Sequence, residues 1–439
     1  MAKGWKINLF LLLILIAAAA VLWWLDDRDA RRVQGEKAAR SVSAMVPKSV
    51  VRVQFWRPAA EKGKEGTTVT IQSQESGSDG KGKSNGRWQM VAPDKARTND
   101  AAVDQLLTIL GESYDQKVSD TVVNPAQFGL DRPDAVLTVH NKEGQSVQLS
   151  LGQIAPASRK RYLQIGVDGP VVLLSSRAIG GLLQNLDALR DKRLFAHSSG
   201  QTVQRITRSR PNEQMIVTRG QDKPWQLESP LADMASANRV DGWLGGLLQA
   251  SGTAFAAVQA EEAFKTSGPD WTVVLENGEV GKETVRIQRQ EGKLLAWREG
   301  DPDALVLDGY LAEELDKPAM ELVALRPLGA HGIPMKLQIT HQDKTLTTAK
   351  ENGQWPKPVW TGIEEILTRD AWRGVKPKPH GEAWLTIIAF QDKEQWVIPF
   401  WKEGETMFLA PPNRPVELEL THYQMEAFMD TVKALFPTE

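Results

Sequence analysis

The feature that most constrains the fold of this chain is an internal duplication. The segments GRWQMVAP and KPWQLESP, around Trp88 and Trp225, share the pattern W-Q-apolar-x-x-P. Fifteen residues after each Trp comes a Val-Asp pair, at 103–104 in the first copy and at 240–241 in the second. Landmarks that recur in one order at nearly fixed spacing predict repeated structural units.

Two later landmarks extend the duplication. The pattern F-x-x-x-x-P-D occurs at 128–134 and 264–270, and Ala-Leu-Arg at 188–190 and 324–326, 57 residues beyond each motif's Pro. A third, degenerate copy follows Trp355. Only 24 residues separate Trp355 from Pro379, so we expect this copy to have lost much of its first helix region.

Each copy has the pattern of a strand pair, a strand carrying the repeat Trp, an amphipathic helix, a meander of strands and a short closing helix. The helices are expected at 99–112, 177–186 and 238–250, with Asn99 and Asn238 as N-caps. Alternating apolar residues predict strands at 50–56, 67–72, 135–140, 147–151, 161–165, 171–174, 205–208 and 215–218. The fold class is therefore α+β, with tandem repeated units on mostly antiparallel sheets.

The N-terminus has the pattern of a membrane anchor. Residues 7–25 form an uncharged run of 19, and a spanning helix needs about 20. A signal peptide cut after Ala20 stays open. The basic count favours a cytoplasmic body, whereas the short tail and long following domain favour export, and we prefer an extracytoplasmic (periplasmic) body. The expected organisation is tail 1–6, transmembrane helix 7–25, juxtamembrane linker 26–48, and repeat units 49–198, 199–330 and 331–439.

The stretch GSDGKGKS, from Gly77 to Ser84, fits the phosphate-loop pattern G-x-x-x-x-G-K-[ST]. A phosphate loop needs a helix directly behind it. Here Asn85-Gly86 predicts a tight turn, and a second strand follows. We therefore expect a solvated hairpin connection and no bound nucleotide.

The Trp–Pro strand, the Val-Asp helix, FGLDRP at 128–133 and LRDKRLF at 189–195 resemble an uncharacterised bacterial domain of unknown function. Its members are membrane-anchored and are often encoded beside gliding-motility-type ABC transporters. The resemblance is strong over about residues 45–200 and weakens afterwards. It implies an extracytoplasmic accessory role and supplies no catalytic residues.

Composition limits the chemistry. The chain has no Cys, which excludes disulfides, thiol nucleophiles and Cys-ligated metals. Its net charge of −2 gives no support to a nucleic-acid partner. The six His do not stand at metal-ligand spacing, and no nucleophile elbow is present. We expect no catalytic, cofactor or metal site, and we assign Asp104 and Asp241 to the positive ends of helices.

Several residues are candidates for contact with a partner. Arg190 and Arg326 close the first two units, with a buried ion pair or a helix C-terminal contact as the alternative. The basic run at 158–162 has the pattern of a solvated strand edge, with contact to anionic lipid or wall polymer as the alternative. The last third is rich in Trp, which either fills the core or forms a partner face. The candidate contact residues are Trp360, Trp372, Arg190, Arg326, Arg159, Lys160 and Arg161.

These features favour a non-enzymatic, single-pass scaffold or accessory protein of the cytoplasmic (inner) membrane, with an ABC transporter permease or auxiliary subunit as the first candidate partner. Two other classes stay open. One is an envelope glycan-binding protein that uses the C-terminal Trp cluster, and the other is a hydrolase whose site is not visible in one sequence.

Overall fold

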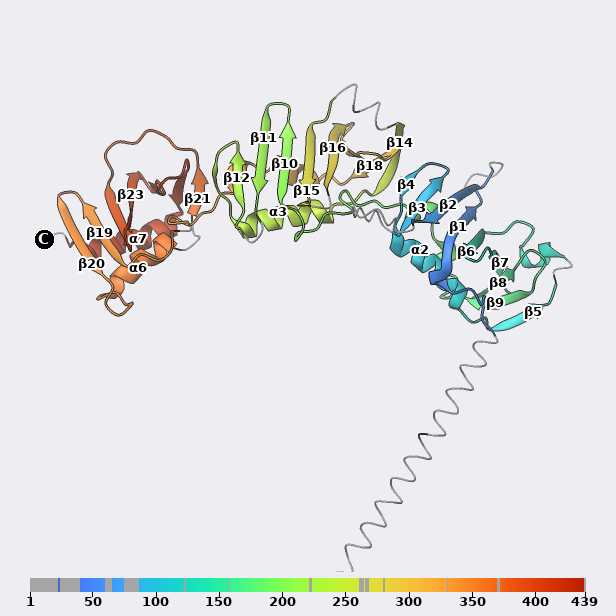
Figure 1. Cartoon of the computed structure of the whole chain (residues 1–439). Coiled ribbons are helices and arrows are strands. Elements are labelled where there is room, and N and C mark those ends of the chain that lie inside the picture. Colours follow the sequence, from blue (N-terminus) through green and yellow to red (C-terminus); the bar gives the residue numbers. More distant parts are fainter. Residues whose placement is uncertain are drawn as a thin grey trace, which may run out of the picture. The chain divides into compact units, whose positions relative to one another are not determined.

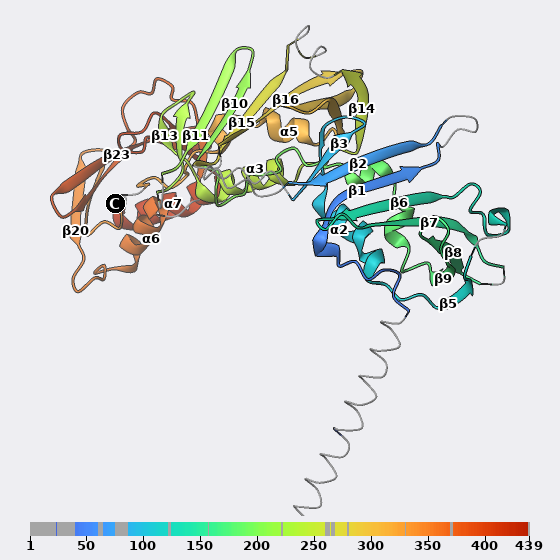
Figure 2. The same ribbon diagram turned by 45° about the vertical axis from the view of Figure 1, so that its right-hand side comes forward.

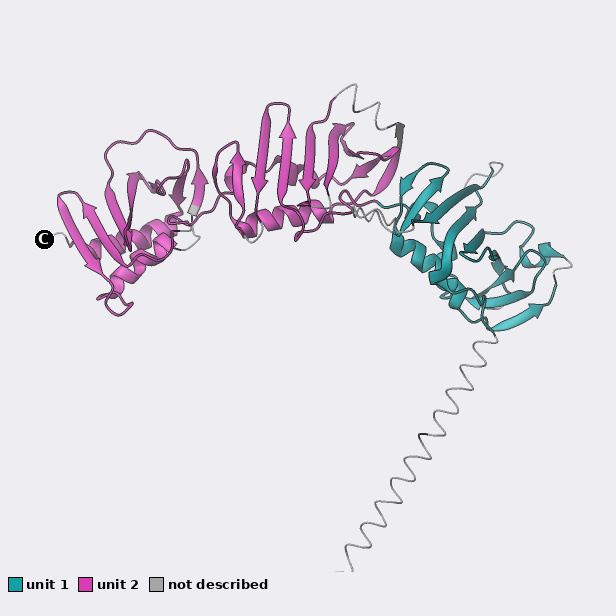
Figure 3. Ribbon diagram, in the orientation of Figure 1, with its two compact units in different colours: residues 1–80, 84–191 teal, residues 81–83, 192–439 magenta. Residues whose placement is uncertain are grey.

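A computed structural model describes residues 23, 40–59, 65–74, 87–121, 124–156, 158–220, 223–259, 264, 268–278, 281–329, 331–368 and 372–437. The chain divides into two compact units at Asp191 and Lys192 (Figure 3). The first unit holds one β-sheet and the second unit holds two.

The first sheet has nine strands, and every pairing is antiparallel. In sheet order they are β4 (Ala96–Arg97), β3 (Trp88–Ala92), β2 (Thr67–Ser73), β1 (Val50–Arg57), β6 (Ala135–Asn141), β7 (Ser146–Ile154), β8 (Lys160–Ile165), β9 (Val171–Ser175) and β5 (Gln116–Ser119). The helical elements are η1 (Pro47–Ser49), α2 (Asp100–Leu107), η2 (Thr108–Gly111), η3 (Pro125–Phe128), η4 (Gly180–Leu183) and η5 (Leu186–Leu189).

The second sheet also has nine antiparallel strands. In sheet order they are β13 (Asp233–Met234), β12 (Gln226–Ser229), β11 (Glu213–Thr218), β10 (Arg205–Arg210), β15 (Trp271–Glu276), β16 (Lys282–Gln290), β17 (Lys293–Arg298), β18 (Asp303–Leu307) and β14 (Ala254–Gln259). Its helical elements are α3 (Ala237–Gln249), α5 (Leu311–Asp316) and η7 (Ala319–Glu321).

The third sheet has seven antiparallel strands. In sheet order they are β20 (Lys344–Ala349), β19 (Lys336–His341), β22 (Leu385–Gln391), β23 (Glu394–Glu403), β24 (Thr406–Leu409), β25 (Glu417–Leu420) and β21 (Trp372–Val375). Its helices are α6 (Pro358–Thr368) and α7 (His422–Leu435).

The three strand orders correspond. In each sheet β1, β10 or β19 lies beside the first strand of a four-stranded meander. The far edge is a strand that precedes this meander in sequence, β5, β14 or β21. Among the described residues, the third sheet has no counterparts of β3 and β4. The helix after them is present as α6, so the prediction that the third copy has lost its first helix region is wrong. In the described part of the third copy, the two strands before this helix are missing instead.

In each sheet the longer helices lie on one face, α2 in the first sheet, α3 and α5 in the second, and α6 and α7 in the third (Figures 1 and 2). Strand β6 alternates between buried and half-buried residues because one of its faces packs on η4 and lies in the core of the first unit. The strand β10 alternates in the same way. An α+β fold on mostly antiparallel sheets is therefore confirmed. The first unit has its own core cluster, and the cores of the second and third sheets are continuous.

The predicted N-cap residue is confirmed in the first copy and is wrong in the second. Asn99 caps α2, and its side chain accepts a hydrogen bond from the backbone N–H of Ala102. Asn238 lies inside α3, whose N-cap is Ser236, so that assignment is wrong. The expected closing helix at 177–186 forms two 3₁₀ turns, η4 and η5, because Gly180 and Gly181 there disfavour a regular α-helix.

Several predictions fall outside the described residues. The candidate membrane span at 7–25 lies there except for Trp23, and so does the stretch from Gly77 to Ser84. Strands β2 and β3 on either side of that stretch pair as an antiparallel hairpin, as the turn residues predict. Among the described residues no helix is long and apolar enough to cross a membrane.

In each copy, the indole of a Trp is hydrogen-bonded to a carboxylate on the first helix. The indole N–H of Trp88 donates to Asp104 at 3.4 Å, and that of Trp225 donates to Asp241 at 2.9 Å. Both rings are buried. The bond ties a strand segment to a helix, which explains why Trp and Val-Asp recur at a fixed distance.

The third copy makes the same bond with different spacing. The indole N–H of Trp355 donates to Glu364 on α6. A cation also lies over each of the three rings, with Arg87 5.0 Å, Arg219 4.4 Å and Lys350 5.1 Å from the ring centroid. The Trp, the carboxylate and the cation, which we call the Trp anchor, therefore recur in all three copies.

We expect Trp225→Ala to lower the free energy of unfolding of the second unit by about 3–5 kcal/mol, since it removes a buried aromatic ring and leaves a cavity. Chemical denaturation with fluorescence detection measures this. The control is Tyr423→Ala, because Tyr423 is 80% exposed and its removal should change stability by less than about 0.5 kcal/mol. Equal effects of the two substitutions would contradict the anchor.

Candidate functional site

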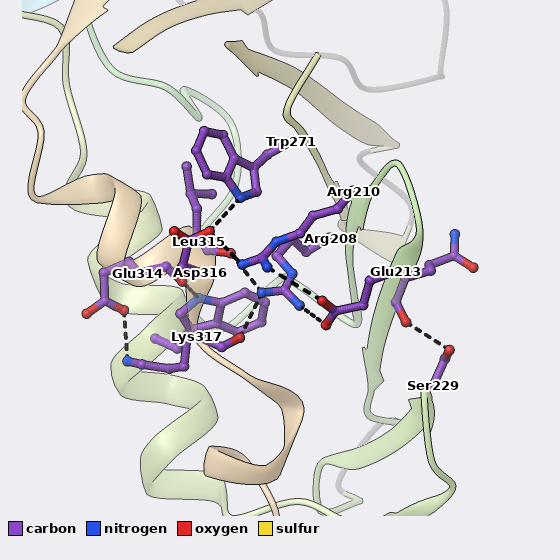
Figure 4. A network of polar contacts seen from close by, with 11 residues as sticks. Arg208, Arg210, Glu213, Ser229, Trp271, Glu314, Leu315, Asp316 and Lys317 are labelled. Atoms are coloured by element: carbon purple, nitrogen blue, oxygen red, sulfur yellow. Dashed lines mark hydrogen bonds and ion pairs between the residues drawn. The ribbon is translucent and has the colours of Figure 1, made fainter. Parts of the chain in front are cut away.

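A cluster of arginines and carboxylates in the second sheet is a first candidate (Figure 4). Arg208 is 1% exposed and donates to the backbone oxygens of Leu315 and Lys317, both at 2.7 Å. Arg210 donates to Leu315 O at 3.0 Å and to Asp316 at 2.6 Å. Burial lowers the pKa of the Arg208 guanidinium from its ordinary value.

This cluster holds an element in place. The carbonyl oxygens at the end of a helix lack intrahelical partners and attract cations. The first sheet does the same with Arg57, which occupies the register position of Arg210 and donates to Leu182 O at 2.9 Å. The arginines therefore fix α5 and η4 to their sheets, and the repetition identifies them as structural.

In the first two sheets, the face opposite the longer helices is covered in part by a Phe. Phe128 packs edge-on against Tyr162 of β8 at 5.0 Å, and Phe264 stacks on Trp297 of β17 at 6.4 Å. Both Phe begin the F-x-x-x-x-P-D pattern. Gly129 follows the first Phe with a φ of +67°, as expected for a turn-forming Gly. The recurring Phe thus covers part of the sheet with an apolar ring, and we call it the apolar plug.

The third copy replaces this plug with ionisable residues. The strand registers place Phe408 of β24 where Tyr162 lies in β8. They also place Glu417 of β25 where the first sheet has the buried Val171 and the second the buried Ala304. His380 lies 5.7 Å from Phe408, as Phe128 lies against Tyr162.

His380 is bonded through both ring nitrogens. Its Nδ1 lies 2.9 Å from Glu403 Oε1 and its Nε2 lies 3.0 Å from Glu417 Oε2. The ring is 3% exposed and stacks on Trp401 at 4.3 Å. Lys378 pairs with Glu403 and lowers the pKa of that carboxyl below its ordinary value. We call His380, Glu403 and Glu417 the histidine bridge.

The bridge consists of two hydrogen-bonded contacts that join one imidazole to two carboxylates. A protonated imidazole donates to both carboxylates, whereas a neutral ring donates only one hydrogen bond. Both nitrogens are engaged, so neither is free to take a proton from a substrate. The bridge connects the segment before β22 to β23 and β25. His380 stands before a Gly, as Phe128 does, but His331 does so too, and the sequence therefore did not single out His380.

The last three residues of the basic run at 158–162 begin the interior strand β8. Strand β8 pairs with β7 on one side and β9 on the other, so the prediction of a solvated edge is wrong. Lys160 pairs with Asp115 at 3.5 Å, and Arg161 pairs with Asp134. Arg159 is exposed. The side chains of Arg159 and Lys160 are exposed, whereas that of Arg161 is only 14% exposed.

The two closing arginines are not equivalent. Arg190 forms a bridge with Thr98, and the corresponding bridge in the second copy joins Ala235 to Val323. Val323, and not Arg326, therefore occupies the position of Arg190. The half-buried Arg190 donates its backbone N–H to Asp187 O at the end of η5. Arg326 is exposed at its side chain.

The carbonyl of Arg326 takes part in a buried clamp between the second and third sheets. Arg414 donates to Arg326 O at 3.0 Å and makes a two-bond ion pair with Asp233 at 2.7 and 2.8 Å. The side chains of Arg414 and Asp233 are 5% and 1% exposed. A fully hydrogen-bonded pair of this kind fixes geometry.

The C-terminal Trp residues lie mainly inside. Trp360 and Trp396 are each 5% exposed, and Trp355 stacks on Trp360 at 6.5 Å. Trp360 therefore does not present a partner face, contrary to that prediction. Trp372 begins β21, which pairs with β25. Trp401 covers His380 on the helix-free face.

Two further kinds of site can be assessed within the described residues. No three His, Asp or Glu side chains there are arranged to hold a metal ion. A shallow depression at one end of the second sheet is lined by Arg205, Glu228, Glu276 and Lys282, among others. Arg205 and Glu228 pair with each other at 3.0 Å, so the depression gives little support to a ligand site.

The match with known proteins falls on the first two copies. Residues 88–270 match a domain of unknown function, DUF4340. The match runs from the anchor Trp of the first copy to the end of the F-x-x-x-x-P-D pattern of the second. It agrees with the resemblance found in the sequence. No curated protein matches the chain.

The histidine bridge predicts an unusual pattern of stabilities. We expect His380→Phe to cost about 3–5 kcal/mol, because Glu417 stays buried without its partner. The double variant His380→Phe with Glu417→Val restores the apolar pair of the first copy. It should recover the parent's free energy of unfolding within about 1 kcal/mol or exceed it. Denaturant titration measures both, and a double variant as unstable as the single one would contradict the equivalence.

Proposed function

We propose that this chain is a non-enzymatic, single-pass scaffold that stands outside the cytoplasmic membrane and holds an envelope complex together. Its partners of first choice are the permease or auxiliary subunits of an ABC transporter. The support is architectural. The copies share one sheet order, each with helices on one face, and they follow a segment at 7–25 with the composition of a membrane span.

The polar clusters also support a scaffold. The two arginines at α5, the clamp at Arg414 and the histidine bridge all satisfy groups of the chain itself. Catalytic groups have to reach a substrate. The clusters described here therefore stabilise repeated units and the joint between two of them.

The glycan-binding alternative depends on accessible indoles, since sugar rings stack on exposed aromatic faces. Trp360 and Trp396 are buried, and Trp401 is stacked by His380. These positions favour a role of the C-terminal Trp residues in the fold. A glycan that co-purifies with the chain would reverse this preference.

Affinity capture after crosslinking tests the proposal. Intact cells are crosslinked, their membranes are dissolved in mild detergent, and the full chain is captured. We expect transporter permease or auxiliary subunits at yields comparable with that of the chain. A matched control carries Leu12→Arg and Ile14→Arg, which disrupt the apolar run and should abolish co-purification. Capture of the chain alone, or with glycan only, would contradict the proposal.

A separate experiment tests on which side of the membrane the body lies. The chain has no Cys, so a single introduced thiol reports its location. Ser199 is exposed and Val203 is fully buried. An impermeant maleimide on intact cells should label Ser199→Cys and leave Val203→Cys unlabelled. Labelling of Ser199→Cys only after lysis would place the body in the cytoplasm.

A further inference from the structure

Within the described residues, the third sheet ends in a long edge strand where the other two sheets continue. In the first sheet β2 is followed by β3 and β4, and in the second β11 is followed by β12 and β13. In the third, β20 pairs with β19 and is the last strand of the sheet (Figure 1). The outermost strands β4 and β13 have two residues each, whereas β20 has six.

The strand registers identify equivalent positions. Leu346 of β20 lies opposite Ile339 and corresponds to Val69 and Met215, which point into the cores of their sheets. Thr348 corresponds to Ile71 and Val217, both fully buried under β3 and β12. The edge of β20 is therefore the surface that a strand covers in the other two copies.

The backbone of β20 has hydrogen-bonding groups for another strand. The N–H of Lys350 donates to Met335 O, toward β19. Because directions alternate along a strand, Leu346 and Thr348 also bond toward β19, and Thr345, Thr347 and Ala349 point toward the edge. Within the described residues, β20 is paired with β19 alone.

Strands β3 and β12, which we call the covering strands, have two functions. The third copy keeps one of these functions. The segments of β3 and β12 bring the anchor Trp to its carboxylate and also pair with the neighbouring strand. Trp355 reaches Glu364 from the turn before α6 and supplies the anchor without a strand. The third copy thus lacks only the strand.

We propose that the edge of β20 binds an extended segment of a partner protein, which adds to the third sheet as an antiparallel strand. This inference rests on the proposed scaffold function and names its docking surface. Strand addition to an exposed edge is a common mode of peptide recognition. The covering strands β3 and β12 are the internal precedent, since each is antiparallel to its neighbour.

The same precedent defines the partner's chemistry. The covering strands place a large apolar residue against the buried side, Met90 in β3 and Leu227 in β12. The bound segment should therefore alternate, with an aliphatic residue opposite Thr348. A second copy of β20 offers Thr345, Thr347 and Thr348 along its length, which fits this requirement less well than an aliphatic strand.

Natural sheets commonly blunt their edges with short strands, prolines or charges. The sequence KTLTTA of β20 has a charge only at its first residue and contains no Pro. Its three Thr are β-branched and favour an extended backbone. The strand is thus preorganised to accept a partner.

Site-specific photocrosslinking tests the inference. A photoreactive residue replaces Thr345 in the full chain, in membranes of cells that naturally contain it. The same chain then carries Thr347→Pro, which removes an edge-facing N–H, or Thr347→Val, which keeps it. We expect a crosslink to an extended segment of another protein, reduced at least tenfold by Thr347→Pro and unchanged by Thr347→Val.

Other results would overturn the inference. An adduct of two copies of this chain identifies a dimer edge instead. An adduct that survives Thr347→Pro shows contact through side chains rather than strand addition, and the lack of any adduct shows an unoccupied edge. Circular dichroism checks that Thr347→Pro is folded. Ala349→Pro, at the next edge-facing position, must remove the adduct as well.

The affinity capture described above separates this inference from the proposed function. If the transporter subunits co-purify as well with Thr347→Pro as with the parent chain, the scaffold stands and the β20 edge is not its docking surface. If the parent chain brings down no protein, the scaffold proposal fails and the inference fails with it.

Discussion

The bond between a Trp indole and a carboxylate on the neighbouring helix is the interaction around which each copy is built. Trp88 bonds Asp104, Trp225 bonds Asp241, and Trp355 bonds Glu364. A typical intramolecular hydrogen bond contributes only about 0.5–1.5 kcal/mol to stability. Its value is geometric, because it fixes the position of a large buried ring between sheet and helix. Once the ring is placed, helix and strand share one core.

The third copy shows which parts of the unit are exchangeable. It keeps the Trp anchor, the helix and the meander, but it drops two strands and replaces an apolar plug with His380, Glu403 and Glu417. Both changes lie away from the helix-covered face. The open face and edge therefore vary while the core stays constant, as expected where a repeated unit acquires a binding role.

The sequence predicted the elements best where spacing was preserved. The positions of β1, β2, β6 and α2 were within a few residues, because their apolar periodicity and the N-cap Asn99 are local signals. The helix α6 was missed, since Trp355 stands three residues before it and Trp88 twelve before α2. Arg326 was matched to Arg190 through spacing, although the pairing register selects Val323.

The candidate site was harder to predict than the fold. Nothing local distinguishes His380 from the other five His, and its role depends on Glu417, which is 37 residues away in sequence. The burial of Trp360 was equally hidden, because an amphipathic helix does not show which of its faces a neighbouring sheet covers. The open edge of β20 became visible only when three sheet orders were compared.

Hydrogen exchange along the three equivalent strands tests the central claim most directly, that three copies of one unit differ by a missing covering strand. In the purified chain, the edge-facing amides of Thr345 and Thr347 in β20 should exchange at least about tenfold faster than the amides of β2 and β11, which are covered on both sides. Equal protection of β20, β2 and β11 in the isolated chain would contradict the account.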